Sequence, residues 1–285
     1  MIAITGATGR FGRIAIEHLL KHVPPARIVA AVRAPQKAID LAQRGVHVRV
    51  ANYDRPETLR IAFEGVEKLL LVSGSEVGRR LLQHKAVIEA ARAAGVELLA
   101  YTSILHAETS PIELALEHRQ TESALKASGL PHVLLRNAWY VENLLGAIPA
   151  ALQHGVLLGS AGTGRISCAS RADYAEAAAA VLLSAQPQAG RIYELAGGTA
   201  FTQAELAAEV ARQSGRRVDY QCLPEQDYKA ALMRAGMSAG FAALVAQADA
   251  AAAHGALFGS EPDLERLIGR PTTTLQQAVA KALPR

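Results

Sequence analysis

A glycine-rich turn near the start of the chain limits the possible folds more than any other feature of the sequence. The apolar stretch 2–5 leads into the run Thr5-Gly6-Ala7-Thr8-Gly9-Arg10-Phe11-Gly12, and apolar residues at helical spacing follow. The first glycine allows a tight exit from a strand, the second lets the backbone approach a pyrophosphate, and the third lets the helix pack closely on a sheet. The alternative is a glycine-rich loop without a ligand. We therefore expect a dinucleotide site built from Gly6, Thr8, Gly9, Arg10, Phe11 and Gly12.

Strand-like and helix-like segments then alternate over the first half of the chain. We expect strands at 2–5, 28–33, 46–51, 68–73, 98–103 and 132–136. Helices are expected between them, at 36–44, 56–63, 77–94 and 113–128. The run 68–73 shows no polar alternation, as expected for a strand covered on both faces. Repeated βα units predict an α/β fold, a Rossmann-type doubly wound parallel sheet with right-handed crossovers.

The rhythm changes after residue 136. We expect a helix at 140–154, a short strand at 166–169, a helix capped by Asp173 and running to Ser184, and a strand at 192–195. Thr202 is expected to cap a helix to Ser214, and the tail 225–284 is expected to be mainly helical, broken at 269–271 and restarted at 273 or 274. The predicted domains are a dinucleotide-binding domain over 1–136, completed by parts of 165–195, and a smaller mixed α/β substrate region over 137–285, interleaved with it.

The end of the second strand indicates which dinucleotide binds. NAD-binding units place Asp or Glu here, on the ribose 2′-hydroxyl, but the residues are Val32-Arg33-Ala34-Pro35-Gln36-Lys37. Arg33 can hold a 2′-phosphate with two hydrogen bonds, and Lys37 can add a point charge. The alternative is a solvated surface arginine. The pattern favours NADP(H).

Small polar residues end three later strands, where open α/β sheets form their ligand crevice. We expect cofactor contacts from Ser73, Gly74, Ser75, Thr102, Ser103 and Asn137. For the two hydroxyl residues at 102 and 103, which we expect to face the nicotinamide, local turn capping is an equal alternative.

The usual catalytic pair of alcohol-oxidising short-chain dehydrogenases is absent, because none of the seven tyrosines is followed four residues later by Lys. His118 and Glu122 lie one turn apart on the corresponding helix. His118 can donate a proton or hydrogen-bond a carbonyl; alternatively the pair only ties down the helix surface. Tyr140 and Asn143 are further catalytic candidates beside Trp139, where an aromatic floor with amide groups suits a flat carbonyl compound. Alternatively, these aromatic residues are core between domains.

Composition excludes several other classes. Thirty Lys and Arg against 26 Asp and Glu give a formal charge of +4, a small and scattered excess that does not indicate nucleic-acid binding. The two cysteines form no CxxC or metal-spaced cluster, so we expect no metal and a reduced, cytoplasmic setting. Because a strand begins at Ile2 and no apolar stretch is long enough to span a bilayer, we expect no leader and no membrane contact.

Several motifs are similar to those of the NmrA-like branch of the atypical short-chain dehydrogenases. They are GATGRFG at 6–12, Ala-Val-Arg at 31–33, Asn-Tyr-Asp-Arg-Pro at 52–56, Tyr-Thr-Ser at 101–103, Leu-Arg-Asn-Ala-Trp-Tyr at 135–140, Arg-Ala-Asp at 171–173, and Leu-x-x-Leu-Ile-Gly-Arg-Pro at 264–271. The resemblance covers essentially the whole chain. Within the branch it is nearest to the type 2 NAD(P)H:quinone oxidoreductases, with the triphenylmethane reductases nearby. One position departs, since Asn52 stands where the family often has Asp.

The resemblance implies a Rossmann domain, a small C-terminal domain, NADPH and two-electron reduction of a quinone. A quinone accepts hydride readily, which makes sense of the missing Tyr and Lys. A single dinucleotide turn implies no flavin. We therefore predict direct hydride transfer from NADPH to a quinone-like acceptor by a monomer or homodimer. The alternatives are a non-catalytic NADP(H)-binding regulator, and a reductase of triphenylmethane dyes or related electrophiles.

Overall fold

The computed structural model describes residues 1–283, and the last residue of the expected tail, Pro284, lies outside the described residues. The described chain divides into two compact units. The sheet unit is made of three segments, Met1–Ala107, Leu116–Asn137 and Arg171–Tyr193. The second unit is made of Glu108–Ala115, Ala138–Ser170 and the remaining residues from Glu194.

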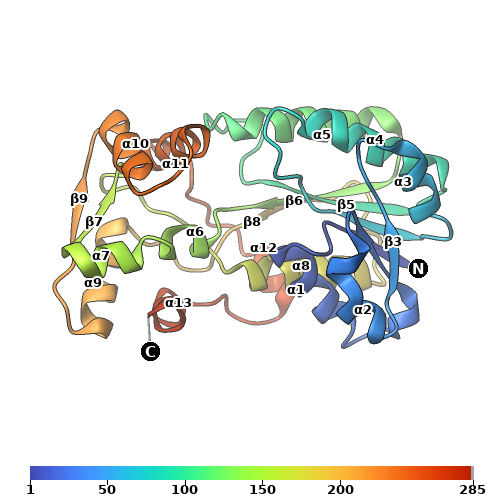
Figure 1. Cartoon of the computed structure of the whole chain (residues 1–285), viewed down its shortest axis with the longest axis horizontal. Helices are drawn as coiled ribbons and strands as arrows, with labels where there is room; N and C mark the ends of the chain where they lie inside the picture. The colour runs from blue at the N-terminus through green and yellow to red at the C-terminus, as the bar shows by residue number, and fades with distance from the viewer. Residues whose placement is uncertain (284–285) are drawn as a thin grey trace. The chain divides into compact units, whose positions relative to one another are not determined.

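A seven-stranded sheet forms the centre of the first of these units (Figure 1). Its strands are β1 (Ile2–Thr5), β2 (Ile28–Val32), β3 (His47–Val50), β4 (Lys68–Leu71), β5 (Leu98–Ile104), β6 (His132–Asn137) and β8 (Ile192–Leu195). Their order is β3-β2-β1-β4-β5-β6-β8, and the pairings among β1 to β6 are parallel. The direction of strand addition reverses between β1 and β4, where doubly wound sheets bind ligands. The predicted Rossmann-type α/β class is confirmed.

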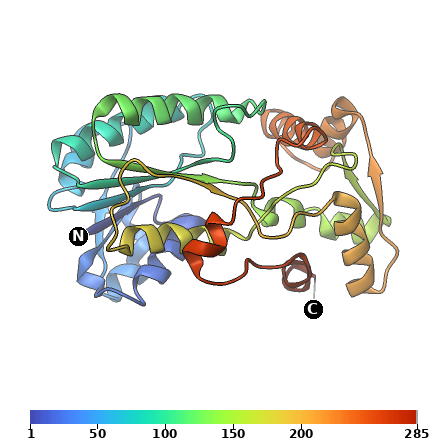
Figure 2. The ribbon, with the colours of Figure 1, turned by 180° about the vertical axis from the view of Figure 1, so that it is seen from behind.

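Helices cover both faces of this sheet. On one face lie α3 (Pro56–Ala62), α4 (Arg80–Ala93) and α5 (Leu114–Ser128), and their apolar side chains join those of the strands in one buried cluster (Figure 1). On the other face α1 (Arg10–Leu19) packs against α8 (Arg171–Leu183), which Figure 2 shows in yellow beneath the sheet. β1, β2 and β5 are buried along their whole length. The two helical layers explain these continuous apolar strands.

The second unit has a two-stranded parallel sheet of β7 (Val156–Gly159) and β9 (Asp219–Cys222). Its helices are α6 (Val141–Leu145), α7 (Ile148–His154), α9 (Gln203–Ser214), α10 (Glu225–Arg234), α11 (Ala239–Ala252), α12 (Asp263–Ile268) and α13 (Leu275–Ala282). Its core combines residues of α6, α7, α9, α11 and α13 with apolar residues of the loops, including Phe201 and Leu257. No helix within residues 1–283 is long and apolar enough to cross a membrane.

Several local predictions differ from the structure. The helix expected at 36–44 is a 3-10 turn (η2, Pro35–Ala38) followed by α2 (Ile39–Gln43). The helix expected from 77 begins at Arg80, since Gly78 takes a φ of +84°. Residues 166–169 form only isolated bridges, and Asp173 lies inside the first turn of α8 and so does not cap it.

Two predicted helix starts are confirmed in detail. Thr202 caps α9, and the side chain of Glu205 returns a hydrogen bond to the Thr202 backbone. The break at Gly269 and Pro271 is also present, and Thr274 restarts the chain as the cap of α13, paired with Gln277.

Candidate cofactor-binding site

The turn after β1 has a backbone that favours glycine at position 6 and requires it at position 12. Gly6 has a φ of +59°, and its carbonyl accepts the Gly9 N–H at 2.8 Å. A Cβ at Gly12 would lie 2.5 Å from the Gly6 oxygen, so the first turn of α1 packs directly on the loop. Gly9 is the N-cap of α1, and no side chain caps this helix. The helix end can therefore bind an anion through its backbone N–H groups.

The other predicted residues of this turn differ in exposure. Arg10 is exposed at the start of α1, Thr8 is half-buried, and Phe11 is buried under the helix. Arg10 and Thr8 can reach a ligand at the turn, while Phe11 offers its backbone.

Arg33 directly follows β2, and 66% of its side chain is exposed. Its guanidinium lies 2.8 Å from the carboxylate of Glu76, in the loop after β4. Glu76 also accepts a hydrogen bond from Gln83 at 3.1 Å and lies 3.4 Å from Arg79. Lys37 is exposed on the neighbouring 3-10 turn. The arginine available for a 2′-phosphate thus already has an acidic partner, which the sequence did not reveal.

The loop after β4 is held in place by buried side chains. The Ser73 N–H donates to the Thr102 hydroxyl at 2.8 Å, and the Gly74 N–H donates to His84 Nε2 at 3.0 Å. Arg80 donates to the Gly74 carbonyl. Ser75, next in the loop, is exposed. The chain that would pass beside a cofactor is therefore rigid at its first two residues.

The contacts of His84 fix its protonation. Its Nε2 accepts a backbone hydrogen bond, so its Nδ1 carries the proton and donates to Thr121 at 3.0 Å. Burial, with a smaller contribution from Arg80, lowers the pKa of His84 to about 4. At neutral pH this histidine is uncharged and serves to hold the loop.

A buried ion pair lies behind the ends of β5 and β6. Arg136 donates to both carboxylate oxygens of Glu122, at 3.0 and 2.6 Å. The Ser103 hydroxyl donates to the same carboxylate at 2.5 Å. Both predicted hydroxyl residues, Thr102 and Ser103, are thus hydrogen-bonded within the protein. Ser103 ties the end of β5 to α5, and Thr102 ties it to the loop after β4.

Asn137, the last residue of β6, stands out among the described polar groups. Only 4% of the residue is exposed, and neither its amide nitrogen nor its amide oxygen has a hydrogen-bond partner. Buried polar groups in native proteins are nearly always paired, because an unpaired one costs about 1–3 kcal/mol. An unpaired amide at the carboxyl end of a central strand fits a polar ligand group in the crevice.

His118 is buried in α5, and its Nδ1 lies 2.8 Å from the Tyr101 hydroxyl. Burial lowers the pKa of His118 to about 3, and it also raises the pKa of Tyr101. Glu122, one turn away, binds Arg136. At neutral pH His118 is therefore a neutral hydrogen-bonding group with no ready proton to give as an imidazolium.

The remaining catalytic candidates lie in the second unit. Tyr140 is half-buried at the N-cap of α6, and its backbone pairs with Ala169. Asn143 is exposed one turn further along the helix. Trp139 packs against the core of this unit. In sequence, these residues follow directly after Asn137.

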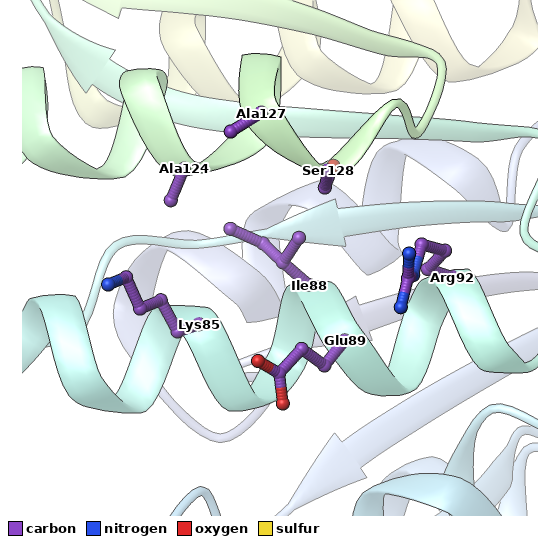
Figure 3. Close-up of a pocket in the computed structure, with 7 residues that line it drawn as sticks. All are labelled: Lys85, Ile88, Glu89, Arg92, Ala124, Ala127 and Ser128. Atoms are coloured by element: carbon purple, nitrogen blue, oxygen red, sulfur yellow. The ribbon is translucent and has the colours of Figure 1, made fainter.

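The predicted cofactor residues of the sheet unit come together at the carboxyl ends of β1, β2, β4, β5 and β6. A separate hollow of about 300 Å³ lies in the helical layer between α4 and α5 (Figure 3). Ile88 points across it toward Ala124, and charged side chains of α4 border it. None of the predicted site residues lines it.

A profile of the NmrA-like family matches residues 1–277. The chain belongs to the NmrA-like family. Quinone oxidoreductase 2 of Escherichia coli (strain K12) is 54% identical over 280 residues, which cover 98% of each chain. The predicted resemblance is confirmed.

Solved structures agree with this assignment. The E. coli NADPH-dependent quinone oxidoreductase QOR2, complexed with NADPH, superposes with a TM-score of 0.97 at 53% identity and 99% coverage of both chains. The Citrobacter sp. triphenylmethane reductase, complexed with NADP(H), superposes with a TM-score of 0.95 at 38% identity, covering 99% of this chain and all of its own.

Proposed function

We propose that this NmrA-like protein is an NADPH-dependent oxidoreductase that transfers hydride directly to a quinone-like acceptor, without flavin. The observation that carries the proposal is the turn at 6–12 with Arg33 beside it, in a chain 54% identical to a quinone oxidoreductase. The site geometry supports the cofactor, and the relative supports the acceptor.

The residues at the strand ends fit NADPH. Gly6, Gly9 and the N-terminus of α1 would hold the pyrophosphate, with Thr8, Arg10 and Phe11 around it. Arg33 and Lys37 would hold the 2′-phosphate. The cofactor would then run past Ser73, Gly74 and Ser75 toward Thr102, Ser103 and Asn137. The unpaired amide of Asn137 supports this path, because both of its polar atoms need a partner.

Bound NADPH supplies the hydride, and the protein has to place the acceptor and keep water away. Asn137 would donate its amide N–H to a polar group of the bound molecules. His118, neutral and tied to Tyr101, orients β5 and α5 and would at most donate a weak hydrogen bond. We place Tyr140 and Asn143 at the acceptor, where a ring and an amide would orient a flat carbonyl compound. The reduced acceptor would take its proton from water.

The proposal extends to the location, the oligomeric state and the binding partners of the protein. We propose a cytoplasmic enzyme, monomeric or homodimeric, that acts on a small molecule and binds no nucleic acid. The likeness to triphenylmethane reductase favours triphenylmethane dyes as a second class of acceptor.

The test is NADPH oxidation by the purified protein, followed by absorbance with a panel of quinones and triphenylmethane dyes. We expect oxidation that depends on an added quinone and a protein with no flavin absorbance. A protein that binds NADPH but turns over none of the panel would instead support a redox regulator.

A further inference from the structure

We propose that Glu76 is a specificity-determining residue that opposes Arg33 in the choice of dinucleotide. The inference rests on the proposed use of NADPH. The carboxylate of Glu76 lies 2.8 Å from the Arg33 guanidinium, the group that a 2′-phosphate would need. Glu76 occupies Nη1 of Arg33, so a 2′-phosphate held end-on by Nη1 and Nη2 would compete with the carboxylate for this nitrogen.

The place of this ion pair in the sheet explains why it bears on cofactor binding. Arg33 directly follows β2, and Glu76 lies in the loop after β4. In the sheet these two strands flank β1, whose carboxyl end continues into the glycine turn. The pair thus connects the two strand ends on either side of the predicted dinucleotide site.

Glu76 does not depend on Arg33 to keep its position. Gln83 donates to its second oxygen at 3.1 Å, and Arg79 lies 3.4 Å from the same atom. The loop is also tied down on either side of Glu76, at Gly74 by His84 and at Gly78, whose N–H donates to Glu117 at 2.9 Å. When Arg33 turns to a phosphate, the carboxylate of Glu76 stays in place and remains close to the new anion.

The two dinucleotides respond differently to this arrangement. The 2′-phosphate of NADPH competes with Glu76 for one guanidinium and is repelled by the fixed carboxylate. The uncharged 2′-hydroxyl of NADH does neither. Glu76 therefore lowers affinity for NADPH and leaves affinity for NADH nearly unchanged. It reduces the preference for NADPH over NADH that Arg33 creates.

The experiment is calorimetric titration of NADPH and of NADH into wild type and Glu76→Gln. Because exposed ion pairs are weak, we expect NADPH to bind about two- to fivefold more tightly to the variant. NADH should change by less than twofold. Glu67→Gln is the matched control. Glu67 also pairs with an arginine at 2.8 Å, but it precedes β4 and so lies at the amino ends of the strands, away from the glycine turn. The control removes one negative charge far from the predicted site, so it should change the affinities for NADPH and NADH only slightly, by less than twofold.

A second pair of variants tests whether the effect passes through Arg33. In an Arg33→Ala background the competition for the guanidinium is gone and only the repulsion between Glu76 and the 2′-phosphate remains. Glu76→Gln should therefore bring a clearly smaller gain in NADPH affinity than it does in wild type. A gain as large as in wild type would overturn the proposal, as would unchanged or weaker NADPH binding to Glu76→Gln alone. Wild type that binds NADPH and reduces quinones would keep the proposed function intact in those cases. Wild type that binds no NADPH would overturn both.

Discussion

Replacing Asn137 by Leu should separate stability from activity. The buried amide has two polar atoms without partners, and removing both, at about 1–3 kcal/mol each, should recover about 2–6 kcal/mol in the free protein. The larger leucine should cost about 1–3 kcal/mol through overpacking at the end of β6. We therefore expect the free energy of unfolding of the cofactor-free protein to rise by about 2 kcal/mol. NADPH-dependent quinone reduction should fall about fivefold to a hundredfold, since leaving a polar ligand group unpaired costs about 1–3 kcal/mol.

The assay is urea unfolding followed by circular dichroism, together with kcat/KM for quinone reduction. Thr102→Val is the matched control, because the Thr102 hydroxyl is equally buried but accepts the Ser73 N–H at 2.8 Å. Its loss should destabilise the protein by about 1–3 kcal/mol. If Asn137→Leu destabilises the protein as much as Thr102→Val and leaves kcat/KM unchanged, the amide is a structural group and our assignment is wrong.

Three further predictions concern charge and protonation. Arg33→Asp should weaken NADPH binding about tenfold to a hundredfold while NADH binding holds or improves; equal loss of both dinucleotides in a titration would contradict a 2′-phosphate site. His118→Ala should lower quinone turnover only a few-fold in steady-state assays, because a neutral buried imidazole is not the proton source; a hundredfold loss at unchanged NADPH affinity would show that it is. Stability should fall as pH drops from about 6 to 4. In this pH range His84 and His118 bind a proton each in the unfolded chain but not in the folded protein, where their pKa values are lowered to about 4 and 3. Asp249 does the opposite, because its folded pKa of about 6 keeps a proton on it that the unfolded chain releases. The net uptake of one proton predicts a slope of about 1.4 kcal/mol per pH unit in urea unfolding curves, and a flat profile would refute it.

Local signals in the sequence predicted much of the sheet unit. The strands at 2–5 and 192–195 have the predicted bounds, because apolar runs between turn residues suffice to mark them. The capping box at Thr202 is likewise a local pattern. By contrast, β7 and β9 were not predicted. Each has four residues, and the polar run of β9 becomes a strand only by pairing with β7.

In the candidate site, too, local patterns predicted some residues, while the roles of others depend on the tertiary fold. Arg33 could be placed from its position at a strand end, since that follows from the βα pattern. Its partner Glu76 is 43 residues away, and their contact depends on how the loop after β4 folds back. The role of His84 depends on the packing of α4 against that loop. No spacing rule carries this information, and only the folded arrangement supplies it.

The three-segment construction of the sheet unit has a consequence for synthesis on the ribosome. α1 is made among the first residues, but the helix that packs against it, α8, belongs to the last segment of the unit, just before β8 joins the sheet beside β6. A nascent chain that ends at Asn137 therefore presents an apolar helix face and an open strand edge to its surroundings. Such surfaces promote aggregation while they wait for distant partners. Slow translation between β6 and α8 should thus increase the dependence of this protein on chaperones.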